Sequence, residues 1–276
     1  MNAEYRGENT EYRKKHTHHG FGRVYLAGIG ASMKSAAAYR VNFLLMNLFD
    51  LVWAVAAPLV TILIYGSGAS FPGWTFWEVM LMQGLFELSS ALCAVFVENI
   101  VWSTMNHVRE GSLETVLLKP MPPILYMVST SFRLDSFGGL LGGLVLTLIA
   151  AGNCEIMAIS LPLCILIFAA GFAVNSAASL ISAAASFKWV ANSRLSEIRM
   201  SFENFGIYPV KIFPSALRFA VTFILPYAAM GCFPAEILLG RFDYINILLI
   251  IPAALFLMFA IWFYNHMIRL YEGVGG

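Results

Sequence analysis

The chain has 276 residues, of which 59% are hydrophobic and 12% charged, with a mean hydropathy of +0.73 and a net charge of +1. That much apolar surface cannot be hidden in a single soluble core of this length, so a soluble globular protein is excluded. The sequence therefore predicts an all-α integral membrane protein, and the small net charge indicates nothing about partners.

The N-terminal region is polar and basic. Residues 1–22 are expected to form a solvated cytoplasmic tail, with a metal site at His16, His18 and His19 as the alternative. From Arg23 to Arg40, apolar residues recur on one face, which favours a helix lying in the membrane interface over a plain extension of the first span. Basic residues crowd this stretch, which places the N-terminus in the cytoplasm by the positive-inside rule.

The first two predicted spans each carry an acidic residue. Asn42–Tyr65 contains Asp50, for which packing or an interfacial position is the first interpretation and a transport pathway the second. Phe76–Val101 contains Glu87 near its centre. Because charges at that depth face other helices or water, Glu87 is a candidate pathway residue or conformational latch, and a structural hydrogen bond is the alternative.

A polar stretch then connects two long apolar runs, with the sequence REGSLETVLLKP from Arg109 to Pro120. Ser112 suits a helix start, and Glu114 lies in the first turn, where the helix dipole favours an anion. Leu113, Val116 and Leu117 follow the i, i+3, i+4 spacing, so they share one face of a helix too short to span. The pattern indicates either a docking helix or a solvated connector.

The third and fourth spans are predicted over Pro123–Ala151 and Ile159–Ala185. The third contains two overlapping Gly-xxx-Gly pairs, Gly138/Gly142 and Gly139/Gly143, which let another helix approach closely. Four separated cysteines are expected to be small buried hydrophobic residues, and these are Cys93, Cys154, Cys164 and Cys232.

The region after the fourth span supports two topologies. Hydropathy alone predicts a cytoplasmic segment over Phe187–Ser215, rich in charge, followed by a span over 217–239. The other topology places the fifth span at about 190–208 and a proline-broken re-entrant element at about 209–240, and we favour it. Tyr244–Met267 is the last span in both, which gives six spans in one domain over 23–268 and a cytoplasmic tail over 269–276.

The connector resembles the coupling helix in permease subunits of bacterial type-2 ATP-binding-cassette exporters, which sits in a cleft of the ATPase subunit. The matching residues are Glu110, Gly111, Ser112, Leu113, Glu114, Leu117, Leu118, Lys119 and Pro120. The runs Tyr208-Pro209, Phe213-Pro214, Leu225-Pro226 and Phe233-Pro234-Ala235 to Leu239-Gly240-Arg241 carry the resemblance further along the chain. It implies that Leu113, Val116 and Leu117 form the face that the ATPase grips, with Arg109, Glu110, Gly111 and Glu114 around it.

By this resemblance the chain is the permease of an ATP-driven exporter in the bacterial plasma (inner) membrane, with both termini cytoplasmic. It implies ATPase subunits and a second permease, a sister chain or another copy, as partners. Membrane lipid is the further partner expected, and no nucleic acid is. The chain lacks the phosphate-binding motif G-x-x-x-x-G-K-[ST], so no enzymatic activity, cofactor or metal is expected in it, and ATP and Mg²⁺ would bind the ATPase. The alternatives are an ATP-independent channel or proton-coupled carrier that uses Asp50 and Glu87, and a non-transporting membrane scaffold.

Overall fold

The computed structural model describes residues 22–189, 193–241 and 247–271. Within these ranges all regular secondary structure is helical, as the sequence predicts. His16, His18 and His19 lie outside the described residues, as does most of each tail expected at the two ends of the chain.

The helices differ widely in length. A first helix covers residues 22–38. The α-helices that follow are α2 (Arg40–Gly66), α3 (Phe76–Cys93), α4 (Asn99–Arg109), α5 (Leu113–Leu117), α6 (Pro123–Ser129), α7 (Phe137–Gly152), α8 (Leu161–Ala185), α9 (Ser193–Glu203), α10 (Ser215–Phe219), α11 (Cys232–Leu238) and α13 (Ile250–Met267). Two π-helical turns are η1 (Ala94–Glu98) and η6 (Ala220–Ile224). Single 3₁₀ turns are η2 (Leu134–Ser136), η3 (Ala158–Ser160), η4 (Asn204–Ile207), η5 (Val210–Ile212), η7 (Tyr227–Ala229) and η8 (Ile268–Leu270).

Five helical runs are long and apolar enough to cross a membrane. They are Arg40–Gly66, Phe76–Arg109, Leu134–Gly152, Ala158–Ala185 and Ile250–Leu270. The third begins at Leu134 and not at Pro123, because α6 ends before Thr130 and forms a separate short helix. The chain is thus a multi-pass membrane protein, and the sixth expected span is not among the runs found in the described residues.

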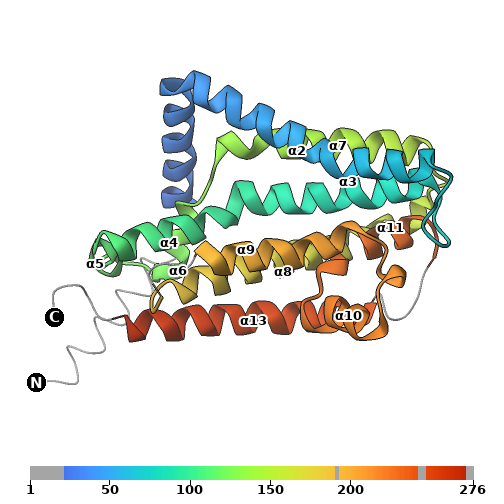
Figure 1. The fold of residues 1–276 in the computed structure, drawn as a ribbon. Coiled ribbons are helices and arrows are strands. Elements are labelled where there is room, and N and C mark those ends of the chain that lie inside the picture. Colours follow the sequence, from blue (N-terminus) through green and yellow to red (C-terminus); the bar gives the residue numbers. More distant parts are fainter. Residues whose placement is uncertain (1–21, 190–192, 242–246, 272–276) are drawn as a thin grey trace, which may run out of the picture.

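The segment expected to hold the fifth span is short and charged. Helix α9 has 11 residues and carries Arg194, Glu197, Arg199 and Glu203, so it falls below the length and hydropathy of a spanning helix. It nevertheless runs along α8 within the bundle, and η4 continues it to Ile207 (Figure 1). Residues 217–239 do not form one span either, since they are divided among α10, η6, η7 and α11.

The bundle is organised around α3 and α8. Helix α7 packs against both α2 and α3, whereas α8 packs against α13, α4 and α3 (Figure 1). Helices α3, η1 and α4 run on without a break from Phe76 to Arg109 and link the two groups. Of the four cysteines, Cys93, Cys164 and Cys232 are buried as expected, and Cys154 is partly exposed.

The two predicted glycine pairs of α7 pack against two different helices, α2 and α3. Gly138 and Gly142 face α2, and a Cβ at Gly138 would lie 1.9 Å from the backbone oxygen of Asn47. Gly139 and Gly143 face α3, where a Cβ at Gly143 would lie 2.7 Å from a backbone nitrogen. Because the pairs are offset by one residue, α7 approaches a helix on each of two sides.

The helix over residues 22–38 points in a clearly different direction from α2 (Figure 1). It contacts the segment between α6 and α7, where Ser32 Oγ accepts a hydrogen bond of 3.0 Å from the backbone N–H of Leu134. Gly28 lies so close to Ser129 that a Cβ would be 2.5 Å from its carbonyl oxygen. This first helix is therefore fixed to the connection that leads from α6 into the third span.

Candidate functional site

The predicted coupling segment begins with a tight turn at the end of α4. Gly111 has a φ of +66°, a conformation that costs glycine little. The Ser112 N–H donates to the His107 carbonyl at 3.0 Å and the Gly111 N–H to the Val108 carbonyl at 3.3 Å, which is the Schellman arrangement. The Ser112 hydroxyl is also 2.8 Å from Nδ1 of His107. These contacts set the direction in which α5 leaves α4.

Helix α5 turns two of its three expected docking residues into the protein. Leu113 is 0% exposed and Val116 is 1% exposed. Both belong to an apolar cluster that includes Val108 of α4 and Met127 of α6. The expectation of one outward apolar face over Leu113, Val116 and Leu117 is therefore corrected, because the bundle itself covers most of that face.

The opposite side of the segment is open to solvent. Leu117 is 44% exposed and Leu118 is 85% exposed. Arg109, Glu110 and Glu114 are exposed as well. The exposed surface of the segment is thus mixed, with leucines and charged side chains, and the segment lies at one end of the bundle (Figure 1).

The two carboxylates in predicted spans, those of Asp50 and Glu87, line the same groove. Asp50 of α2 and Glu87 of α3 line a hollow of about 280 Å³, and Glu98 lies in the same wall. Arg133 and Asp135 also border it but pair with each other through two hydrogen bonds, of 3.0 and 2.7 Å. No ion pair involving Asp50 or Glu87 occurs in the described ranges of the chain.

The groove continues along the bundle. A second hollow of about 420 Å³ shares Trp53, Glu87 and Ser90 with the first and extends to Asn204 and Tyr208. Its walls come from α2, α3 and the segment that begins with α9. The two hollows together therefore form a partly polar groove that acidic side chains line.

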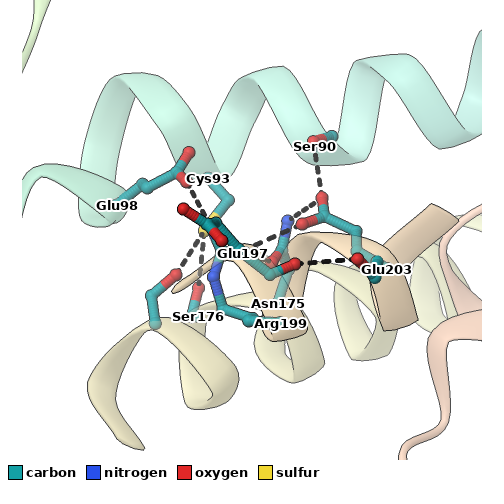
Figure 2. Close-up of polar contacts among 10 residues, drawn as sticks. Ser90, Cys93, Glu98, Asn175, Ser176, Glu197, Arg199 and Glu203 are labelled. Carbon is teal, nitrogen blue, oxygen red and sulfur yellow. Dashed lines mark hydrogen bonds and ion pairs between the residues drawn. The ribbon is translucent and has the colours of Figure 1, made fainter. Parts of the chain in front are cut away.

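A buried ion network holds α9 against the rest of the bundle (Figure 2). Arg199 is 7% exposed, forms an ion pair with Glu98, and forms another with Glu203 at 2.9 Å. Asn175 of α8 accepts from Arg199 at 3.1 Å and donates to Glu203 at 2.8 Å. The hydroxyl of Ser90 donates to Glu203 at 2.7 Å. Three helical segments are thus tied to one guanidinium and one carboxylate.

The π-helical turn η1 lies directly beside this network. Its last residue is Glu98, and the carbonyl of Val95 accepts a hydrogen bond of 2.9 Å from the backbone N–H of Arg133. A π turn releases carbonyls from the regular α-helical pattern, and such turns are frequent at functional sites. The groove, the ion network and the start of the third span therefore converge at η1.

Comparison with known proteins assigns the chain to a family. A family model described as ABC-2 family transporter protein matches residues 51–275. The chain belongs to this family. No curated protein and no solved structure gave a match.

As an ABC-2 family permease, the chain is a membrane subunit without a catalytic site of its own. The family match covers Glu87, the ion network and the coupling segment, while Asp50 and the helix over 22–38 precede it. Among the described residues of this ABC-2 permease, no group of three or more His, Cys, Asp or Glu side chains is placed to hold a metal ion.

The sequence of this permease shows the charges between Lys188 and Lys211 but does not show how they pair. Arg199 and Glu98 are 101 positions apart, and no local pattern joins them. The available signal was the spacing of Arg199 and Glu203, which is i, i+4 and puts both side chains on one face of α9.

Proposed function

We propose that this permease is half of the translocation pathway of an ATP-driven exporter. The observation that carries the proposal is the ABC-2 family match together with the exposed α4–α5 turn at one end of the bundle. The chain has no phosphate-binding loop, so ATP and Mg²⁺ would act on separate ATPase subunits. A second permease, a sister chain or another copy, would complete the path.

In this proposal the ATPase docks on the exposed edge of the coupling segment. Leu117 and Leu118 supply the apolar contact, and Arg109, Glu110 and Glu114 set the orientation at its rim. Leu113 and Val116 act on the other side, where their burial against α4 and α6 transmits force into the bundle. A partner that pushes α5 would then move α4 and α6 with it.

We further propose a six-span topology with both termini in the cytoplasm of the bacterial inner membrane. Helix α9 and η4 would count as the fifth span, because they run along α8 and the buried ion network neutralises part of their charge. The elements from η5 to α11 would then enter the outer leaflet and return. The helix over 22–38 would lie in the inner interface, in keeping with its angle to α2 (Figure 1).

A second candidate is a carrier or channel that works without ATP. The observation in its favour is the groove that brings Asp50 and Glu87 together, since intramembrane carboxylates also serve as proton relays. This alternative predicts transport in membranes that contain the chain but no ATPase.

The test is to change exposed and buried leucines of the segment to aspartate. Leu118→Asp should release the ATPase or uncouple it, while the bundle stays folded, because the side chain makes no buried contact. Leu270→Asp is the matched control, since Leu270 is 56% exposed at the same end of the bundle. Leu113→Asp should instead destabilise the chain, because it places a charge in the core.

The readouts are co-purification of the ATPase, ATP turnover and transport in reconstituted membranes. We expect all three to fall for Leu118→Asp and to stay at the wild-type level for Leu270→Asp. Unchanged ATPase binding and coupled transport in Leu118→Asp would remove the coupling role. Transport that persists with no ATPase present would favour the carrier.

A further inference from the structure

A cleft lies at the end of the bundle away from the coupling segment, among η5, α10, η6 and α11. It has a volume of about 360 Å³. Figure 1 shows α10 and α11 at the opposite end of the long helices from α5. Neither the groove residues nor the ion network border this cleft, so the export mechanism proposed above makes no use of it.

One wall of the cleft is apolar and continues onto the exposed surface. Phe219 is 57% exposed and Phe223 is 38% exposed, and their ring centroids are 5.3 Å apart on successive turns of α10 and η6. Phe233 of α11 forms the buried side. Ser215–Ile224 is an apolar helical run that is too short to span a bilayer.

The other wall is basic, with Lys211, Arg218 and Arg241 all lining the cleft. Arg241 is held in place, because it donates to Glu78 and lies 5.3 Å from the ring centroid of Trp74. Lys211 is 3.7 Å from a carboxylate oxygen of Glu236, which is longer than a good hydrogen bond. The side chain of Lys211 is 66% exposed, and its ammonium group has three N–H donors, so it can bind a further partner.

Arg218 is the cation of the cleft for which the described residues supply no carboxylate partner. One nitrogen, Nη2, donates to the backbone carbonyls of Lys211 and Phe213 at 3.1 and 3.2 Å. Within the described ranges Arg218 pairs with no carboxylate. A guanidinium has five N–H donors, so the fixed Nη2 orients the group while Nη1 and Nε remain able to bind an anion.

We propose that this cleft binds an acidic phospholipid, with the phosphate between Lys211 and Arg218 and an acyl chain along Phe219 and Phe223. The ligand must be an anion because, among the residues that the structure describes, the cations of the cleft exceed the carboxylates that pair with them. It must carry an apolar part because the adjoining wall is exposed phenylalanine. A free phosphate would leave the aromatic wall in water, and a neutral lipid would leave Arg218 without an anion. The proposal does not depend on the ATPase.

The test measures lipid binding to the full-length chain in a neutral detergent by native mass spectrometry. Phosphatidylglycerol and phosphatidylcholine with the same acyl chains are titrated separately, and inorganic phosphate is added as a competitor. Arg218→Gln and Lys211→Gln remove the two proposed phosphate contacts at exposed positions, so the fold should hold. Arg194→Gln is the control, because Arg194 is an exposed arginine on α9 outside the cleft.

We expect phosphatidylglycerol to bind more tightly than phosphatidylcholine, and each cleft variant to weaken it roughly tenfold while Arg194→Gln does not. Equal binding of the two lipids, or equal binding by Arg218→Gln and Arg194→Gln, overturns the proposal. Displacement of the lipid by inorganic phosphate at equal concentration would identify a site for free anions and overturn it too. Thermal unfolding of each variant checks that a loss of binding is not a loss of fold.

Discussion

The guanidinium of Arg199 in α9 forms an ion pair with the carboxylate of Glu98 at the end of η1. The pair is buried at Arg199 and joined by Glu203 and Asn175, so one cation serves two acidic groups. Removing the cation from such a site strands both carboxylates, whereas removing a carboxylate leaves the other to balance Arg199.

The first prediction follows from that asymmetry. Arg199→Met should lower the free energy of unfolding by roughly 3–5 kcal/mol, because Glu203 loses its counter-charge in a buried place and Glu98 loses it at a partly buried one. Adding Glu98→Gln to Arg199→Met should restore part of the loss. Denaturant unfolding in detergent micelles gives the comparison. Arg194→Met, at an exposed position of the same helix, serves as the control, and equal stability of the two methionine variants would refute the role of the network.

The second prediction concerns the close approach of α7 and α2. Gly138→Ala should destabilise the chain by roughly 1–3 kcal/mol, because the added carbon would lie 1.9 Å from a backbone oxygen that cannot rotate away. Gly152→Ala on the same helix meets nothing within 4 Å and should leave the melting temperature unchanged. Thermal unfolding of the purified chain measures both, and similar values would show that α7 is free to shift.

The third prediction concerns Glu87. Glu87→Gln should leave the fold intact, since no described residue bonds to that carboxylate, but it should alter transport or its dependence on pH. The measurement is transport by reconstituted complex across a range of pH. Glu155→Gln, at an exposed position in the turn after α7, is the control. A transport profile identical to wild type would reduce Glu87 to a packing residue.

The fourth prediction concerns topology. In intact cells, a membrane-impermeant thiol reagent should label Ser215→Cys from outside if the elements around α10 enter from the outer face. Ser215 lies at the start of α10 and is exposed, and Thr115→Cys in the coupling segment should react only after the membrane is opened. Cys154→Ser is a suitable background, because the other three cysteines are buried. Labelling of Ser215→Cys from the cytoplasmic side alone would reject the re-entrant arrangement.

Features with a strong local pattern could be read from the sequence. Long apolar runs identified five spans, and the spacing of the α7 glycines predicted close helix packing. The family resemblance, carried by the run from Glu110 to Pro120, agreed with the family match.

Features that depend on distant partners could not be read in the same way. The spacing of Leu113, Val116 and Leu117 defines one face of a helix but does not say which way it turns, and the chain's own core covers two of the three. Hydropathy alone predicts that the charged residues of α9 lie in the cytoplasm. It does so because it does not show that Glu98, from another helix, supplies a counter-charge to Arg199. The charged cleft at α10 is likewise assembled from η5, α10, α11 and the loop after it.

The unbroken run from Phe76 to Arg109 has a mechanical consequence. Its 34 residues, at roughly 1.5 Å each, make a rod of about 50 Å, whereas the hydrocarbon core of a bilayer is about 30 Å thick. The helical run is therefore about 20 Å longer than the hydrocarbon core is thick, and Gly111 with α5 follows its C-terminal end. If the excess length projects at that end, the proposed ATPase would reach α5 without entering the bilayer. A displacement of α5 would then act on the run about η1, where Arg133 and Glu98 connect it to neighbouring segments.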